Sequence, residues 1–395
     1  MFSFINNIFK KKSTFDTAWP LRGRKVGERV ELPNISCTQY SVSSSNIEPT
    51  QLTSILDTLN LPCSVRGLST GPVTTTFTLD PINGTRIGLL PTRAIDIAVR
   101  LGVESVQIDG NRLTISNPNR AFVNFTDCIH DLYNNILASP LPYIVGSDTN
   151  GKIRIGDLTQ APHTLIAGST GAGKSVFVNN IIASILATRD PTHVRFVMID
   201  PKRVEYAQYQ NLSHLLHPVI DEIPVAINIL KGLCEIMEDR YKFLSKAGFQ
   251  SVEQWNSVKC PSLSGMTAQQ LHDRIYPIVV FIDEYADLVM QDKNAAALVT
   301  RLGQKARAAG IHLVLCTQHP LAKIISTAIT TNFPTRVAFQ VQTASASRVI
   351  LDTGGAENLL RKGDMIYQDA TESFRAQGPF VTPELTNHLV NHWRR

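Results

Sequence analysis

Residues 168–175 read Gly168-Ser-Thr-Gly-Ala-Gly-Lys-Ser175, a complete G-x-x-x-x-G-K-S motif. The motif follows the apolar stretch His163–Ala167 and precedes a helical pattern over Val176–Leu186. A strand, a glycine-rich loop and a helix in that order are the context of a phosphate-binding P-loop. The glycines let backbone N–H groups wrap closely around phosphates, and the helix N-terminus adds positive potential. The stretch therefore predicts a nucleotide site at the end of a buried strand.

The motif supplies the whole set of candidate nucleotide-binding residues. These are Gly168, Ser169, Thr170, Gly171, Ala172, Gly173, Lys174 and Ser175. We expect Lys174 to contact the β- and γ-phosphates of ATP, and the Ser175 hydroxyl to hold Mg²⁺. A chance match is the alternative, and the strand before the motif and the helix after it argue against that.

A second apolar stretch, Ile278–Ile282, ends in the acids Asp283 and Glu284. In a parallel sheet such a strand delivers its carboxylates to the edge where ligands bind. Asp283 is expected to bind Mg²⁺, directly or through water. Glu284 is placed to orient and deprotonate an attacking water molecule. The alternative is a strand that simply ends in solvated acids.

Further candidate catalytic residues lie later in the chain. The stretch His312–Cys316 is followed by Thr317 and Gln318, and the Gln318 amide could sense the γ-phosphate or position water. An ordinary strand-end cap explains the same pattern equally well. Hydrolysis of a nucleoside triphosphate at a P-loop often also needs a positive charge, which can come from a neighbouring subunit. The candidates are Arg307, Arg336 and Arg348, although each of them fits an ordinary surface arginine too.

Outward from the P-loop, apolar strands alternate with helical stretches such as Ala226–Ala247. The predicted strands are His163–Ala167, Val194–Ile199, Ile278–Ile282, His312–Cys316 and Arg336–Gln340. This alternation predicts an α/β fold with a mostly parallel sheet covered on both faces.

Three regions are expected along the chain. We predict a tail and linker over residues 1–45, a small α+β domain over 46–145 and the P-loop domain over 146–395. In the small domain the expected helices are Gln51–Leu61 and Ala94–Leu101, and the expected strands are Val73–Leu79, Ser105–Ile108 and Arg112–Ile115.

Composition narrows the class of protein. The net charge of +5 suits a nucleic-acid partner without demanding one. The cysteines show no C-x-x-C spacing, which argues against a zinc or redox site and is typical of a reduced, cytoplasmic protein. No apolar run reaches the roughly 18–20 residues of a membrane span. Residues 2–12 combine Phe and Ile at helical spacing with three lysines, so they could contact the inner face of a membrane, or instead form a frayed or docked tail.

Several long segments together resemble the FtsK/SpoIIIE family of DNA translocases over roughly residues 50–395. They are Pro162–Ser175, Ile199-Asp-Pro-Lys-Arg-Val-Glu205, Lys305-Ala-Arg-Ala-Ala-Gly-Ile-His312, Pro334–Phe339, Ser347–Asp352 and Lys362-Gly-Asp-Met365. The resemblance implies a RecA-like P-loop NTPase motor preceded by the family's α domain.

The same resemblance implies a homohexameric ring that uses ATP and Mg²⁺ to move double-stranded DNA through its channel. Arg336 or Arg348 would reach the nucleotide of a neighbouring subunit. Lys323, Arg348, Arg361 and Lys362 lie in segments that could form loops contacting the DNA backbone. His319 stands where the family usually has arginine, and Gln342–Ala346 lacks the charged residues common there, so the DNA loops are expected to differ in detail.

Family members also carry membrane spans and a DNA-reading γ domain, and neither is expected in this sequence. That favours a motor serving a mobile element or phage. A conjugative double-stranded DNA pump at the membrane is an alternative, with residues 2–12 as its anchor. An ATP-switched assembly scaffold that binds DNA or protein is a third hypothesis, which Glu284 argues against because a switch needs no catalytic base. A small-molecule kinase is disfavoured by the family segments beyond the P-loop.

Overall fold

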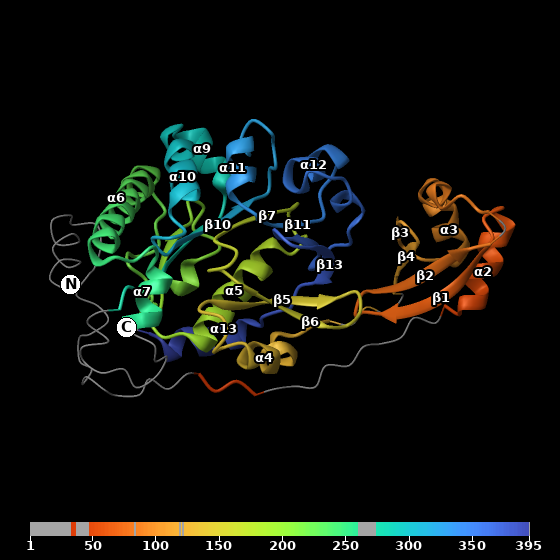
Figure 1. The fold of residues 1–395 in the computed structure, drawn as a ribbon, viewed down its shortest axis with the longest axis horizontal. Helices are drawn as coiled ribbons and strands as arrows, with labels where there is room; N and C mark the ends of the chain where they lie inside the picture. The colour runs from red at the N-terminus through yellow and green to blue at the C-terminus, as the bar shows by residue number, and fades with distance from the viewer. Residues whose placement is uncertain are drawn as a thin grey trace.

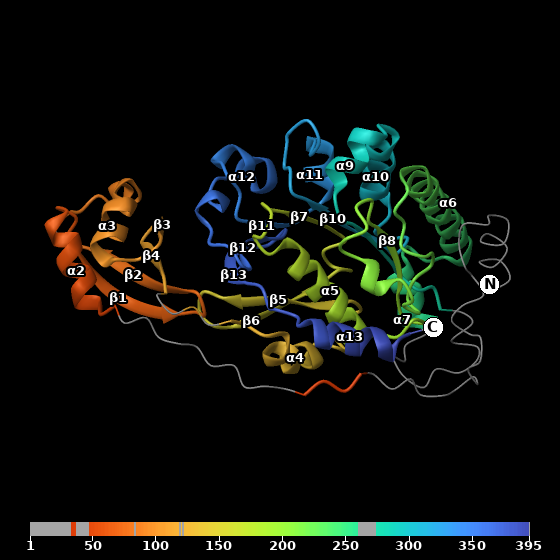
Figure 2. The same ribbon diagram turned by 180° about the vertical axis from the view of Figure 1, so that it is seen from behind.

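The computed structural model describes residues 33–36, 47–82, 84–117, 120, 122–259 and 274–394. Its elements form two sheets, an antiparallel one early in the chain and a large one that carries the P-loop (Figures 1 and 2). Residues 2–12, expected to be amphipathic, lie outside the described residues. In the part of the chain that is described, no helix is both long enough and apolar enough to cross a membrane.

The small sheet has the strand order β1-β2-β4-β3, and every neighbouring pair is antiparallel. Its elements are α2 (Pro49–Thr58), β1 (Cys63–Thr70), β2 (Thr74–Pro81), the 3₁₀ helix η1 (Ile87–Arg93), α3 (Ala94–Leu101), β3 (Val106–Asp109) and β4 (Arg112–Ser116). The helices α2 and α3 bury their apolar faces against the sheet around Leu56, Phe77 and Leu113. The α+β prediction for this region is thereby confirmed.

The large sheet has the strand order β6-β5-β13-β12-β11-β7-β10-β9-β8. Its strands are β5 (Pro142–Asp148), β6 (Ile153–Asp157), β7 (His163–Ala167), β8 (Arg195–Ile199), β9 (Ile278–Ile282), β10 (Ile311–Thr317), β11 (Thr335–Phe339), β12 (Asp364–Gln368) and β13 (Ser373–Gln377). The strands from β11 to β8 are all parallel, which confirms the predicted parallel core. The strands from β12 to β6 extend the sheet in antiparallel fashion, which the sequence pattern did not predict.

Helices cover both faces of the large sheet (Figure 1). They are α4 (Phe125–Asn134), α5 (Lys174–Thr188), α6 (Ile223–Ala247), α7 (Val252–Lys259), α9 (Tyr285–Gln291), α10 (Asn294–Lys305), α11 (Thr327–Asn332), α12 (Ala344–Leu351) and α13 (Pro383–His392), with the 3₁₀ turns η2 (Ala207–Tyr209) and η3 (Ala356–Asn358). Because successive side chains of a strand alternate between faces, β9 places Phe281 in the core with α5 and α13, and Val280 and Ile282 in the core with α6 and α10.

The two sheets are joined by the segment between β4 and α4. Both α4 and β5 begin before residue 146 and pack with the large sheet, so elements of the P-loop region start earlier in the chain than the expected boundary. Side chains link the sheets as well, with Arg375 Nη1 donating to Gln107 Oε1 at 3.0 Å and Ser69 Oγ donating to Asn150 Oδ1 at 2.7 Å.

Candidate active site

The P-loop connects β7 to α5 and has the backbone geometry of a phosphate cradle. Gly171 and Gly173 adopt positive φ angles of 76° and 128°. Residues other than glycine rarely adopt such backbone angles. A Cβ atom on Gly173 would lie 2.7 Å from the backbone nitrogen of Gly363. That nitrogen donates to the carbonyl oxygen of Ala172 at 2.9 Å. The loop therefore needs glycine at Gly173, and the Lys362-Gly363 turn supports it from outside.

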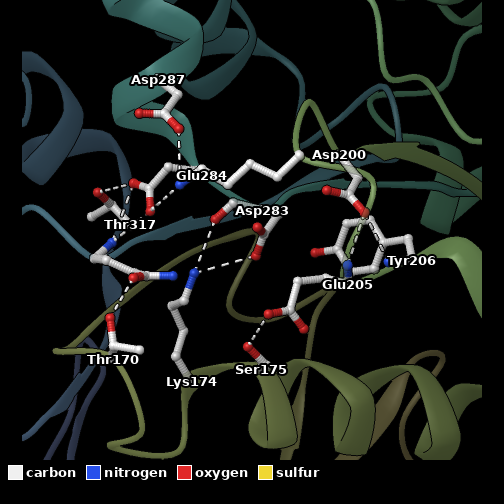
Figure 3. Close-up of polar contacts among 12 residues, drawn as sticks. Thr170, Lys174, Ser175, Asp200, Glu205, Tyr206, Asp283, Glu284, Asp287 and Thr317 are labelled. Carbon is white, nitrogen blue, oxygen red and sulfur yellow. Dashed lines mark hydrogen bonds and ion pairs between the residues drawn. The ribbon is translucent and has the colours of Figure 1, made fainter.

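Lys174 begins α5 and reaches Asp283 at the end of β9 (Figure 3). Its Nζ lies 3.2 Å from both Asp283 Oδ1 and the Asp283 carbonyl oxygen, and both side chains are almost fully buried. Burial by itself lowers the pKa of Lys174, but the nearby carboxylates of Asp283 and Glu284 raise it above its ordinary value. Burial raises the pKa of Asp283, and the Lys174 ammonium opposes that rise. The predicted phosphate and magnesium ligands thus meet as a buried ion pair.

Glu284 is completely buried and both of its carboxylate oxygens accept hydrogen bonds. Thr317 Oγ1 donates to Oε1 at 2.6 Å, and the backbone N–H of Gln318 donates to Oε2 at 3.0 Å. Lys202 lies between Glu284, at 4.0 Å, and Asp287, at 2.9 Å. The candidate base is therefore fixed by the end of β10, which lies between β7 and β9 in the sheet.

Gln318 connects this carboxylate to the P-loop. Its side-chain Oε1 accepts a hydrogen bond of 2.7 Å from Thr170 Oγ1, while its backbone N–H donates to Glu284. One residue at the end of β10 thus contacts the candidate base through its backbone and the phosphate loop through its side chain.

A further acid, Glu205, enters the site although it was not among the predicted site residues. Ser175 Oγ donates to Glu205 Oε1 at 2.7 Å. Asp200 shapes this segment, since its Oδ2 accepts from the backbone N–H groups of Glu205 and Tyr206 at 2.9 and 3.0 Å. The signal for Glu205 was its place in the segment 199–205, which follows the parallel strand β8 and so arrives at the same edge of the sheet as Asp283.

The predicted arginines lie away from this cluster and differ among themselves. Arg336 points into its own chain, where it donates to the carbonyl oxygen of Thr330 at 2.9 Å and pairs with Asp352. Arg348, on α12, and Arg307 are exposed. Of these three, only Arg336 has a side chain that is largely buried, and it links α11 with the end of α12.

The site has room and chemistry for a magnesium nucleotide. A cavity of about 410 Å³ opens beside the P-loop, within the range of roughly 300–1,000 Å³ that ligand pockets occupy. It is lined by Ser169, Thr170, Gly171, Gly173, Lys174, Ser175, Val176, Glu205, Gln318, Lys362, Gly363, Gln377, Gly378, Phe122, Val123 and Phe380.

The oxygen ligands that suit Mg²⁺ are the Ser175 hydroxyl and the carboxylates of Asp283 and Glu205. Among the described residues no group of three or more His, Cys, Asp or Glu side chains forms a metal site of its own.

The fold and site together define the P-loop NTPase class, in the version where one strand, β10, separates the P-loop strand from the strand that carries the acids. Models of the FtsK/SpoIIIE family and of the FtsK alpha domain match residues 133–322 and 31–119. The chain belongs to the FtsK/SpoIIIE family.

Individual relatives agree with this membership. The chain is 37% identical over 359 residues to the DNA translocase FtsK of Vibrio vulnificus, an alignment that spans 85% of this chain and 36% of that protein. It is 35% identical over 386 residues to the DNA translocase SftA of Bacillus subtilis, spanning 94% of this chain and 40% of that protein. The chain thus spans at most half the length of these curated relatives.

A solved structure shares the fold. The pCW3 conjugation coupling protein TcpA superposes with a TM-score of 0.59 at 22% identity, covering 87% of this chain and 98% of that one.

Proposed function

We propose that this chain is the motor of an ATP-driven translocase for double-stranded DNA. The observation that carries the proposal is the position of Glu284, which is buried beside the Lys174–Asp283 pair and held by Thr317 and Gln318. A carboxylate fixed in this way can accept a proton from a water molecule attacking the γ-phosphate. A nucleotide-switched scaffold would not need such a base.

In the proposed reaction the P-loop N–H groups bind the phosphates, and Lys174 exchanges its contact with Asp283 for one with the β- and γ-phosphates. Ser175 and Asp283 would hold Mg²⁺, and Glu205, which accepts a hydrogen bond from Ser175, would lie next to them. When bound, the ion would supply positive charge for the phosphate oxygens. A change in the position of the P-loop would reach Glu284 through Gln318, because Gln318 contacts both Thr170 and Glu284.

We further propose that the motor works as a ring in which Arg348, and not Arg336, reaches the nucleotide of a neighbouring subunit. Support comes from exposure, because Arg348 is exposed whereas Arg336 is bound within its own chain. Lys323 and Arg361 are exposed and remain candidates for contacts with DNA phosphates. Lys362, which we expected in a DNA loop, lines the nucleotide cavity and is assigned there instead.

Steady-state ATP hydrolysis with and without linear duplex DNA tests the proposal, with Lys174→Ala and Glu284→Gln as controls. We expect strong stimulation by duplex DNA that both substitutions abolish and that added salt weakens. An ATP hydrolysis rate that does not change with DNA would contradict the translocase proposal. The chain would then be a P-loop ATPase with another partner.

The ring is tested by mixing two inactive variants, Arg348→Ala and Lys174→Ala. If Arg348 acts on a neighbour's nucleotide, mixed rings contain some sites with both residues intact, so part of the activity returns. Arg307→Ala in place of Arg348→Ala is the matched control for an exposed arginine. No recovery on mixing, together with retained assembly, would assign the role to another residue.

Three further points stay predictions. They are service to a mobile element or phage, a cytoplasmic location, and contact of residues 2–12 with a membrane. Neighbouring genes for transfer, partition or packaging would support the first. Cell fractionation with and without residues 2–12 tests the last, since a membrane-anchored conjugative pump should lose its association on truncation.

A further inference from the structure

The loop between β8 and η2 reaches two parts of the candidate active site. It comprises residues 200–206. Glu205, near its end, accepts the hydrogen bond from Ser175 Oγ. Lys202, nearer its start, has its Nζ 4.0 Å from Glu284 Oε2 and 2.9 Å from Asp287 Oδ2. One loop therefore contacts a candidate magnesium ligand with one side chain and lies beside the candidate base with another.

The backbone of this loop is held in a conformation that few residues adopt. Arg203 has a φ angle of 59°, which is uncommon for residues other than glycine. Its N–H donates to the Asp200 carbonyl oxygen at 3.1 Å, and its Nε pairs with Asp221 Oδ2 at 2.6 Å. The N–H of Asp200 donates in turn to the Ile220 carbonyl oxygen at 2.8 Å. Strained backbone persists only where its surroundings enforce it, and it is concentrated at functional sites. Lys202 is therefore presented by a fixed loop.

An ion pair with Asp287 is the ordinary explanation of Lys202, and exposure makes that pair a weak one. The Lys202 side chain is 43% exposed, and ion pairs at such sites contribute little to stability. Glu284, in contrast, is fully buried, and a buried carboxylate needs compensation of its charge. At 4.0 Å the Lys202 ammonium is too far away to donate a hydrogen bond to Glu284, but it is close enough to attract it electrostatically.

The two lysines near Glu284 differ in what they do when nucleotide binds. In the proposed reaction Lys174 leaves Asp283 for the phosphates of ATP, which bring negative charge close to Glu284. Lys202 is not among the described residues that line the nucleotide cavity. It can therefore stay beside Glu284 during that exchange, and its positive charge then opposes the repulsion between the phosphates and the base.

We propose that Lys202 is a positioning residue for ATP hydrolysis, which holds the Glu284 carboxylate in place through its charge. The inference rests on the proposed function, in which Glu284 is the base. Thr317 and Gln318 hold the same carboxylate through hydrogen bonds. Asp287 keeps the long lysine side chain within reach of Glu284, since it pairs with Nζ at 2.9 Å. Loss of the Lys202 charge should therefore slow the chemical step and leave nucleotide binding intact.

ATP hydrolysis at saturating Mg-ATP and equilibrium binding of Mg-ATP, both measured on the full chain, test this role. Lys202→Met keeps the length of the side chain and removes its charge. We expect kcat to fall by about fivefold, the upper end of what an ion pair with an exposed partner contributes, with no change in affinity. Lys202→Arg retains the charge and should retain most of the activity. An unchanged kcat in Lys202→Met, or a loss of ATP binding, would overturn the proposal.

Two matched substitutions separate this role from an ordinary ion pair. Asp287→Asn removes the partner of Lys202 but leaves the lysine charge beside Glu284, so kcat should fall less than in Lys202→Met. An equal loss in both variants would mean that the pair only ties the loop to α9. Lys242→Met removes another exposed lysine, which pairs with Asp239 at 3.2 Å, and should leave kcat unchanged.

The double variant of Lys202→Met and Glu284→Gln shows whether Lys202 acts through Glu284. If it does, Lys202→Met should not lower the residual single-turnover rate of Glu284→Gln any further. A further fivefold loss in that background would assign Lys202 to the nucleotide or to the fold and overturn the inference. A normal rate in Glu284→Gln alone would overturn the base itself. An impaired Glu284→Gln beside an unimpaired Lys202→Met would leave the base in place and remove only the role of Lys202.

Discussion

The two sheets of this molecule differ in whether they bury charged side chains. Among the described residues of 47–117, which form the small sheet and its helices, no Asp, Glu, Lys or Arg is buried. The large sheet buries Lys174, Asp200, Asp283 and Glu284 at one edge. Burial of charge costs free energy unless partners compensate it. The comparison teaches that the large sheet carries the free-energy cost of buried charge at its P-loop edge, a cost that the small sheet avoids.

The largest expected effect is on catalysis at that edge. Glu284→Gln keeps the side-chain shape but removes the base, so kcat for ATP should fall by about 10²–10⁴-fold, the range that general-base catalysis contributes. Nucleotide affinity should remain, because the phosphate contacts lie on the P-loop. Single-turnover hydrolysis and equilibrium ATP binding measure the two quantities separately. A variant that hydrolyses ATP at the normal rate would remove Glu284 from the mechanism.

The next largest effect is expected on the stability of the small sheet. Phe77→Ala empties the centre of its core and should cost about 3–5 kcal/mol of stability there. ATP binding should persist, because no residue of that core lines the cavity. The matched truncation Phe281→Ala in β9 should impair ATP binding as well, since β9 carries Asp283. Urea unfolding and ATP titration of both variants provide the comparison.

Acid should weaken the large sheet selectively. Burial lowers the pKa of His163 and His214 to about 3 and of His312 to about 4. The unfolded chain therefore binds more protons than the folded one below about pH 6.5, so stability falls as the pH falls. From pH 7 to pH 6 the three histidines together should remove about 2 kcal/mol.

Fluorescence of Trp255 and Trp393 during urea unfolding follows this change, because both belong to the large-sheet region. Residues 47–117 contain no histidine, so the small sheet should not share this slope. Replacement of the exposed His388 by Gln is the control and should leave the slope intact. Equal acid sensitivity of the two sheets would contradict the assignment.

The smallest expected effect concerns the support of Glu284. Thr317→Val removes the hydroxyl that donates to Glu284 and should lower kcat by about tenfold, the effect of one hydrogen bond to a charged group. KM should change little, because Thr317 does not line the nucleotide cavity. Thr317→Ser keeps the donor and should retain activity. An increase in kcat would mean that Thr317 restrains Glu284 instead of orienting it.

The parallel core and the P-loop were predictable because their signals are local. The bounds of β7 and β9 match the predicted stretches, since uninterrupted apolar runs leave a buried strand as the consistent solution. The strands β12 and β13 were missed because they mix polar and apolar residues and depend on pairing with β11 and β5.

The site residues also divide into those with a local sequence signal and those without one. The P-loop, Asp283 and Glu284 were recognised from contiguous motifs, and the structure brings them together. Glu205 was missed because it lies beyond the predicted strand Val194–Ile199, in a loop whose conformation depends on the contacts of Asp200. Arg336 or Arg348 was expected to reach a neighbour's nucleotide, and the sequence did not reveal that Arg336 contacts Thr330 and Asp352 of its own chain. Tertiary contacts of this kind leave no trace in spacing.

The position of β10 between β7 and β9 couples the P-loop to the candidate base. Gln318 touches Thr170 with its side chain and Glu284 with its backbone, so the phosphate loop and the base cannot be adjusted independently. The chain beyond Gln318 runs through the exposed residue Lys323 at the protein surface. A displacement of that surface segment would therefore reach both the phosphate loop and the candidate base, because Gln318 contacts both of them.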